Sequence, residues 1–421
     1  MPETLSLKDC HSSKSVRQRV DTWNEKDCEA YCKKHERSHS SPLIKQKINI
    51  VIERFLNLSI RYGGKVEKFP DSLKAYLDII PMKTLLKYVP DEYKDEQHWG
   101  SDELKKLKSH QKNTGVYLWA CGYKPEKIMG KGCNGVVWCC GDKAVKVTAN
   151  RKILFLTNNA VKNELKEAKN LENMHDSWGR GKDYWNVGDR DRLMRPSRGV
   201  TVGKGDVGIT EADLADKDVE HYSEELKNVK EKKEKIKKVL KLAKDVVSGL
   251  KVLHDAGFSH NDVKPRNLLK IGSKLKGNVK AEEMFKVADF GNISPINHTY
   301  RIVGGRYFSS PDMKNLRSEC VAKRDVWSLG ATLLYMLISD HDEKKAKSYV
   351  ADLQKCNNDN DNDIKEFAKK YKILDFEKSE EGFGKFVLRF LKIISDMTKS
   401  DYRSRMSMQS AAIELRALKI A

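Results

Sequence analysis

The chain has 421 residues, of which 33% are charged and 39% are apolar, and its formal net charge is +20. This length suits one large domain with a smaller one, because single hydrophobic cores stop growing at about 250–300 residues. No apolar run approaches the roughly 20 residues that a membrane-spanning helix needs, which excludes a transmembrane protein. The positive charge predicts an acidic partner, whether anionic lipid, nucleic acid or acidic protein, with a solvated lysine-rich surface as the alternative.

The cysteine content and the first residues indicate a compartment. Nine cysteines are too few for a disulfide scaffold in a chain of this length, which favours a reducing environment. Residues 1–15 lack the apolar stretch of a secretory signal and carry acids among their bases, unlike a mitochondrial presequence. We therefore expect a soluble, intracellular (cytoplasmic) protein, with export through a dedicated machine left open.

Two segments precede the main domain. Residues 1–42 are polar and charged, which predicts a flexible segment with one short helix near residues 27–35. Residues 43–118 contain two stretches with wide apolar faces, which predict a helical extension. Metal-ligating side chains at helical spacing also leave a zinc module open beside an ordinary polar helix: Cys28, Cys32, His35 and His39, with Cys10 and His11 upstream.

Residues 119–421 form the predicted main domain. Residues 128–148 are β-branched and aromatic residues broken by glycine, which is typical of a sheet of hairpins. A helix is predicted over 158–175, and loops with one or two strands over 176–208. One long helix is predicted over 223–254, with nine Lys and five acids, or +4, between residues 224 and 245 and a buried apolar second half. The expected fold class is α+β.

A glycine-rich turn lies within the predicted hairpins. Gly130, Gly132 and Gly135 form G-x-G-x-x-G, which lets backbone N–H groups approach phosphate oxygens because no side chain intervenes. A dinucleotide fingerprint needs a helix directly after the glycines, whereas residues 136–140 and 144–148 have the pattern of strands. A nucleotide-binding loop and a purely structural hairpin turn both fit this pattern.

A lysine in the following strand could reach phosphate oxygens. Lys146 alternates with Val145 and Val147 and therefore points to the opposite face of the strand. In the next predicted helix Glu167 is aligned with an apolar seam, so that it could pair with Lys146, and Glu164 is the competing partner.

Two short segments carry the strongest chemical signal. Asp262, Lys264 and Asn267 follow a predicted buried helix, and this spacing can supply a proton acceptor, a phosphate contact and a metal ligand from one loop. Asp289 adds a second carboxylate after a predicted strand. Asn267 and Asp289 offer the oxygen ligands that Mg²⁺ uses when it is bound to a nucleotide.

From Gly130 through Arg405 the order and spacing of these residues resemble the eukaryotic-type Ser/Thr protein kinase family. The resemblance implies a two-lobed fold, with a β-rich N-lobe at about 119–212 and a larger helical C-lobe at about 213–421. It implies ATP and Mg²⁺, or Mn²⁺, as cofactors and a protein as substrate. Lys264, two positions after Asp262, resembles Ser/Thr kinases rather than tyrosine kinases.

The resemblance also assigns roles to single positions. It implies a glycine-rich loop over Gly130 to Val137, with Lys146 as the ATP-orienting lysine and Thr210 as the gatekeeper at the hinge. It further implies the following functions: adenine contacts from the backbone of Glu211 and Ala212, Asp262 as catalytic aspartate, Asp289 as magnesium aspartate, Ser310-Pro311-Asp312 as the Ala-Pro-Glu segment, residues 325–330 as a buried C-lobe helix, and Arg405 as the partner of Asp312.

Two positions depart from the family pattern. Asn261 stands where many kinases have an arginine that binds a phosphate on the activation segment, so phosphorylation of Ser294, Thr299 or Tyr300 has a weaker electrostatic reason to activate the chain. Gly305 replaces a common threonine. The His-Asn-Asp sequence is similar to kinases that bacterial pathogens inject into host cells, which would make the chain an effector secreted into the host. A pseudokinase scaffold and a small-molecule kinase of related fold are the alternatives.

Overall fold

We describe a computed structural model of the chain over residues 12–35, 46–48, 50–52, 54, 114–120, 123–131, 135–149, 191–194, 198–202, 207–272, 275–276, 279–280, 283–296, 307–314, 318–338, 342–358 and 360–420. The chain divides into two compact units. The first unit contains Met1–Lys169 and Pro196–Leu214, and the second contains Asn170–Arg195 and Ala215–Ala421.

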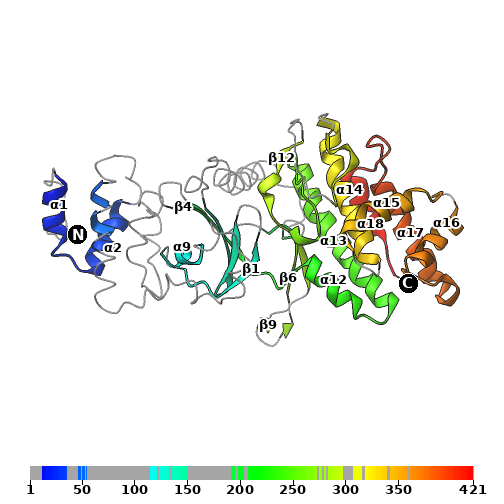
Figure 1. Ribbon diagram of the computed structural model, residues 1–421, viewed down its shortest axis with the longest axis horizontal. Coiled ribbons are helices and arrows are strands. Elements are labelled where there is room, and N and C mark those ends of the chain that lie inside the picture. Colours follow the sequence, from blue (N-terminus) through cyan, green and yellow to red (C-terminus); the bar gives the residue numbers. More distant parts are fainter. Residues whose placement is uncertain are drawn as a thin grey trace. The chain divides into compact units, whose positions relative to one another are not determined.

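A five-stranded antiparallel sheet is the centre of the first unit (Figure 1). Its spatial order is β1-β2-β3-β5-β4. The strands are β1 Lys127–Lys131, β2 Val136–Cys140, β3 Lys143–Ala149, β4 Arg198–Val202 and β5 Val207–Asp213. Val145 and Val147 are fully buried, whereas Lys146 between them is half-buried, as the alternation predicted. The hairpins predicted over residues 128–148 are therefore confirmed.

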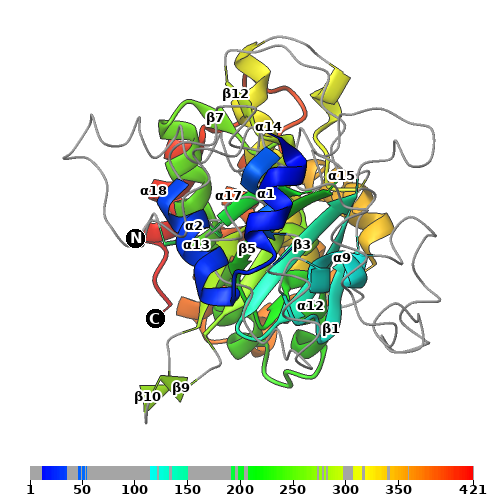
Figure 2. The ribbon, with the colours of Figure 1, turned by 90° about the vertical axis from the view of Figure 1, so that its left-hand side faces the viewer.

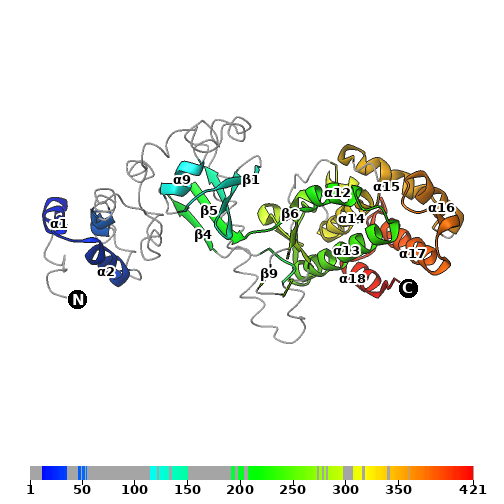
Figure 3. The same ribbon diagram turned by 90° about the horizontal axis from the view of Figure 1, so that it is seen from below.

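A short helix and a tryptophan close the buried side of this sheet. Helix α9, Thr114–Ala120, packs beside β3 (Figure 3). Trp138 on β2 is fully buried, and its indole N–H donates a hydrogen bond of 2.9 Å to the hydroxyl of Thr114. This bond satisfies the only polar atom of a large apolar side chain, so that the ring can fill the core without an unpaired donor.

Two helices near the N-terminus belong to the same unit. They are α1, Ser13–Val20, and α2, Glu25–His35, which covers the helix predicted near residues 27–35. Cys28 and Cys32 are fully buried on α2. Burial raises the pKa of the Cys32 thiol, and electrostatic repulsion from the Cys28 thiolate adds to this effect. His35, another member of the zinc hypothesis, ends α2. Its remaining members, Cys10, His11 and His39, lie outside the described residues, as does most of the predicted extension.

Seven α-helices form most of the described part of the second unit: α12 Val219–Lys227, α13 Lys232–Asp255, α14 Ser318–Leu337, α15 Ala346–Gln354, α16 Asp361–Lys370, α17 Glu381–Met397 and α18 Met408–Ala417. Helices α13 and α14 pack against each other, and α15, α17 and α18 surround them (Figure 1). Gly330 allows α14 to approach α17, because a Cβ there would lie 2.7 Å from Cγ2 of Thr398. Helix α14 is thus the buried helix expected over residues 325–330.

The single helix predicted over residues 223–254 was wrong in one respect. The chain forms two helices, because α12 ends at its C-cap Asn228 and Glu231 has an extended backbone before α13 begins. The break turns the chain so that Tyr222 and Leu226 of α12 join the same core as α13. The apolar residues expected to be buried in the second half are buried, as predicted: Ile236, Val239, Leu240, Ala243, Val247, Leu250 and Leu253.

Short strands and 3₁₀ helices carry the loops of the second unit. A three-stranded sheet has the order β11-β8-β6, β12 pairs with β7, and β9 with β10 forms a hairpin that extends away from the helices (Figure 2). The strands are β6 Lys217–Asp218, β7 Phe258–Ser259, β8 Leu268–Ile271, β9 Leu275–Lys276, β10 Val279–Lys280, β11 Met284–Val287 and β12 Ser294–Pro295. The 3₁₀ helices are η4 Pro265–Asn267, η5 Phe290–Asn292, η6 Pro311–Lys314, η7 Glu343–Lys345 and η8 Phe376–Lys378. Within the described part of the chain, no helix combines the length and apolar character of a membrane span.

Candidate active site

The loop between β7 and β8 brings Asp262, Lys264 and Asn267 together. The Lys264 ammonium lies 2.7 Å from Oδ2 of Asp262, a carboxylate that is 7% exposed. The Asn267 amide nitrogen donates to the main-chain carbonyl of Asp262 at 2.8 Å and to its Oδ2 at 3.1 Å. Both donors fix the orientation of the carboxylate.

The same contacts orient the Asn267 amide. A carbonyl oxygen can only accept a hydrogen bond, so the Asn267 group that faces the Asp262 carbonyl is the nitrogen, and its Oδ1 is the group directed elsewhere. The main chain of Asn267 is held as well, because its carbonyl accepts the N–H of Ala288 at 2.9 Å. An amide oxygen held in this way is a suitable ligand for a hard cation.

Asp289 lies directly after this contact. Its backbone is left-handed, with φ 62°, and its side chain is exposed, whereas Ala288 and Phe290 on either side are buried. Aspartate tolerates this conformation better than most residues, and the turn directs the carboxylate away from the core. One carboxylate and one amide oxygen fit Mg²⁺ that keeps other positions for phosphate and water. Among the described residues, no three His, Cys, Asp or Glu side chains gather into a metal site of their own.

His260 links the loop between β7 and β8 to the segment of Asp289. Its Nε2 lies 2.9 Å from the carbonyl of Ala288, and its Nδ1 accepts the N–H of Asp262 at 3.3 Å. These partners place the ring proton on Nε2. The edge of the ring packs on Phe290, with 5.5 Å between centroids. The imidazole therefore acts here as a buried spacer between two loops.

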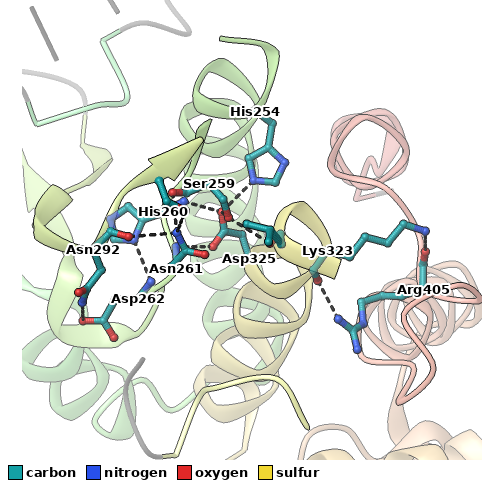
Figure 4. Close-up of polar contacts among 11 residues, drawn as sticks. His254, Ser259, His260, Asn261, Asp262, Asn292, Lys323, Asp325 and Arg405 are labelled. Atoms are coloured by element: carbon teal, nitrogen blue, oxygen red, sulfur yellow. Dashed lines mark hydrogen bonds and ion pairs between the residues drawn. The ribbon is translucent and has the colours of Figure 1, made fainter. Parts of the chain in front are cut away.

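Asp325 of α14 holds the start of the loop between β7 and β8 (Figure 4). Its Oδ2 accepts hydrogen bonds from the Ser259 hydroxyl at 2.8 Å and from the main-chain N–H of His260 at 2.7 Å, and it lies 2.8 Å from Nε2 of His254. Its Oδ1 accepts the N–H of Asn261 at 2.7 Å. Burial by itself raises the pKa of Asp325, but the hydrogen bonds from the His254 side chain and from the main-chain N–H of His260 outweigh it and lower the pKa below its ordinary value.

Sequence reasoning missed Asn292, at the end of η5. Its amide nitrogen lies 3.5 Å from Oδ2 of Asp262, on which Lys264 and Asn267 also converge. Asn292 is 30 residues from Asp262 in the sequence, and no spacing rule connects the two positions. The only feature of the sequence that could have indicated a role for Asn292 is its position directly after Asp-Phe-Gly.

In the first unit, several predicted nucleotide-binding residues form one row across the sheet. Gly130 pairs with Val137, Val137 with Lys146, Lys146 with Thr210, and Thr210 with Gly199. Directly paired residues of antiparallel strands share a face, so Lys146 is flanked by Val137 and the buried Thr210. Gly130 and Gly199 stand at the two ends of this row. Because glycine has no side chain, nothing projects from the face of the sheet at these two positions.

The predicted adenine contacts follow on β5. Glu211 pairs with both neighbouring strands, opposite Val145 and Arg198, whereas Ala212 pairs with Ala144 alone among the described strands. The described pairing of β4 with β5 ends at Arg198 and Glu211, so the backbone of Ala212 has no paired residue on the described part of β4. The Glu211 carboxylate accepts a hydrogen bond from the hydroxyl of Tyr123.

Some predicted positions cannot be placed. Gly132, Glu164, Glu167, Thr299, Tyr300 and Gly305 lie outside the described residues. Ser294 is described and is buried on β12. The ion pair predicted between Arg405 and Asp312 is present, with 3.1 Å between the guanidinium and Oδ1.

The residues from β5 to α18 are similar to a known protein family. Residues 209–414 match the family described as protein kinase domain, which begins in β5 and leaves Gly130 to Lys146 outside the match. Over 96 residues the chain is 33% identical to MAP3K epsilon protein kinase 2 of Arabidopsis thaliana, covering 22% of this chain and 6% of that protein.

Two further relatives are similar over comparable stretches. Serine/threonine-protein kinase TOS3 of Saccharomyces cerevisiae is 32% identical over 112 residues, covering 23% of this chain and 18% of the relative. Serine/threonine-protein kinase PKZ1 of Phytophthora infestans is 29% identical over 111 residues, covering 24% and 28%. The chain thus spans less than a third of the length of each of these curated relatives. Residues 209–414 are thus similar to the protein kinase domain family, and the described helices and strands are consistent with an α+β protein kinase fold.

Proposed function

We propose that the chain is a Ser/Thr protein kinase that transfers the γ-phosphoryl group of ATP to a protein hydroxyl. The observation that carries the proposal is the group of donors fixed on Asp262, since Lys264 and Asn267 both bind its Oδ2. A scaffold without catalysis has no need to orient a carboxylate in this way. The names of the relatives, among them Ser/Thr kinases, support the same acceptor class.

In the proposed reaction the substrate hydroxyl oxygen bonds to the γ-phosphorus while the bond to the β,γ-bridging oxygen breaks and ADP leaves. Asp262 orients the hydroxyl and receives its proton, and Lys264 stabilises the charge on the transferring group. Asn267 and Asp289 would hold Mg²⁺, or Mn²⁺ in its place. The bound cation would neutralise the phosphate oxygens. Little covalent chemistry is asked of the protein, so positioning and charge dominate.

The row across the first sheet supports the nucleotide side of the proposal. Lys146 would orient the phosphates, with Glu167 as its predicted partner, and Thr210 would border the base as gatekeeper. The remaining proposed ATP contacts are the backbone of the glycine-rich loop and of the hinge together with one apolar side chain: Gly130, Gly132, Gly135, Glu211, Ala212 and Val137. The glycines at the edge of the row keep that face accessible to a ligand.

Labelled ATP tests the activity. With γ-labelled ATP, Mg²⁺ and a basic protein substrate, we expect label on serine or threonine and none on tyrosine after acid hydrolysis. Lys146→Ala should lower the rate by about 10²-fold or more, because phosphate-orienting charge is lost. Lys143→Ala is the matched control on the same strand, since Lys143 pairs with Asp213 at 2.8 Å, and it should keep the wild-type rate.

The same assay separates the alternatives. ATP binding without transfer above the Lys146→Ala background would support a pseudokinase scaffold and contradict the proposal. Transfer to a sugar, lipid or antibiotic in place of protein would indicate a small-molecule kinase. The Ser310-Pro311-Asp312 segment, tied to Arg405, supports a protein substrate.

We also propose that activity does not depend on phosphorylation of the activation segment. Asn261 offers no positive charge to a phosphate, and Ser294 is buried. Phosphatase treatment, verified by mass spectrometry, should therefore leave kcat unchanged. Loss of activity on dephosphorylation, with recovery on an acidic substitution at Ser294, Thr299 or Tyr300, would contradict this expectation.

Two further assignments complete the proposal. The His-Asn-Asp sequence at residues 260–262 supports an effector role on host proteins, by resemblance. The net charge of +20 supports an acidic partner. The lysines of α13 are less suited to this role, because Lys233 and Lys241 pair with Glu380 and Asp245, which favours a solvated helix face.

A further inference from the structure

Asn261 has an unusual backbone at the centre of the catalytic loop. Its φ is 67°, in the left-handed region, and the residue is 5% exposed. Its N–H is fixed on Oδ1 of Asp325 at 2.7 Å. Asparagine is among the few residues with a side chain that adopt this conformation readily, so the position can combine a left-handed turn with an amide.

The Asn261 side chain donates hydrogen bonds to groups on β7, on η5 and on β12, and its contacts with Ser259 and Asn292 can be followed in Figure 4. Its amide nitrogen lies 2.9 Å from the carbonyl of Ser259, 3.0 Å from the carbonyl of Asn292 and 3.0 Å from the hydroxyl of Ser294. One NH₂ group thus ties the catalytic loop to the segment that follows Asp289. Its Oδ1 is buried and has no hydrogen-bond partner among the described residues, which costs free energy and indicates that the donor side of the amide is what the site uses.

We propose that Asn261 is a positioning residue whose amide holds residues 292–294 against the catalytic loop and thereby places Asn292 on Asp262. The main-chain carbonyl of Asn292 is bound by Asn261, while its side-chain amide lies 3.5 Å from Oδ2 of Asp262. The uncharged Asn261 amide thus joins residues 292–294 to the loop that carries Asp262, and we call this set of hydrogen bonds the clamp. This inference rests on the proposed kinase function.

The chemistry of the clamp excludes close substitutes. An aspartate at position 261 would keep the shape and tolerate the backbone, but it would set a carboxylate oxygen against the carbonyls of Ser259 and Asn292, which can only accept hydrogen bonds. Glycine would keep the left-handed backbone without strain and remove only the amide. These two variants therefore separate the role of the donor from the role of the turn.

Kinetics on the full chain test the clamp. We expect Asn261→Gly and Asn261→Asp each to lower kcat by about 10- to 100-fold, because Asp262 loses a fixed position, while the Kd for ATP stays at the wild-type value. Asn228→Gly, at the exposed C-cap of α12, is the control and should keep the wild-type kcat. A wild-type kcat in Asn261→Gly would overturn the proposal, as would an equal fall in kcat in the control.

A double variant tests whether Asn261 acts through Asn292. If it does, Asn261→Gly combined with Asn292→Ala should have a kcat no lower than that of the more impaired single variant. Fully multiplicative losses in the double variant would show that the two side chains act independently, and would overturn the proposed route.

Hydrogen exchange distinguishes failure of the clamp from failure of the kinase function. Peptides that cover residues 290–296 contain the N–H groups of Ile293 and Ile296, which bond to the carbonyls of Phe290 and Gly257. We expect faster exchange there in Asn261→Gly than in wild type. Unchanged exchange overturns the clamp even in an active enzyme, whereas faster exchange in a chain that never transfers phosphate supports the clamp and overturns the kinase proposal alone.

Discussion

Replacing Asp262 by asparagine is expected to lower kcat for phosphoryl transfer by about 10²- to 10⁴-fold, the range that a positioned proton acceptor contributes. The variant keeps the size of the side chain but removes its charge and its ability to take a proton. Lys264 and Asn267 would still find one oxygen to bind, so the loop should keep its conformation. Steady-state kinetics with the thermal unfolding temperature measured on the same sample check both statements.

The control for this variant is another aspartate to asparagine change in the same unit. Asp255 lies at the end of α13, where it pairs with Lys251, and it is exposed. Surface ion pairs of this kind contribute little, so Asp255→Asn should match wild type in both measurements. A kcat for Asp262→Asn within a few-fold of wild type would remove Asp262 from the proposed chemistry.

Replacing Asp325 by alanine is expected to destabilise the second unit by about 3–5 kcal/mol, as when one partner of a buried ion pair is removed. The change would remove the acceptor of three donors, namely the main-chain N–H groups of His260 and Asn261 and the His254 ring, whereas the Ser259 hydroxyl would keep the carbonyl of Val321. Urea denaturation of the full chain measures the effect. The exposed Asp375→Ala should change the free energy of unfolding by no more than about 0.5 kcal/mol.

The contribution of Asp325 should depend on pH with a definite sign. Because its pKa is lower in the folded chain than the ordinary value of about 3.9, the carboxylate stabilises the fold above that value. This stabilisation is lost as the pH falls through the folded pKa. The difference in unfolding free energy between wild type and Asp325→Asn should therefore be constant near neutrality and shrink below about pH 4. A difference that grows on acidification would contradict the assignment.

The chemistry-bearing residues could be predicted because they depend on local spacing. Asp262, Lys264 and Asn267 lie within one short loop, and the alternation around Lys146 fixed its face on β3. The apolar half of α13 was likewise readable from its helical periodicity. In each case the pattern lies within a single loop, strand or helix, so that a short stretch of sequence is enough to recognise it.

The supporting contacts could not be predicted because they join distant positions. Asp325 meets the N–H of His260 across 65 residues, and Asn292 meets Asp262 across 30. The first pairing depends on how α14 packs, and the second on how η5 lies against the loop between β7 and β8, and no local pattern encodes either. The break between α12 and α13 has the same origin, since helix propensity continues through the lysines but the shared core requires a turn.

The position of Asp325 sets a limit on how this chain can be controlled. The start of the loop between β7 and β8 is bound to a carboxylate on α14 and, through that carboxylate, to His254 on α13. Both helices belong to the hydrophobic core, so opening the start of this loop means breaking several hydrogen bonds to a buried carboxylate, and each buried group left unpaired costs about 1–3 kcal/mol. A ligand that changes the proposed activity is therefore expected to act on segments held by fewer buried contacts than the loop of Asp262.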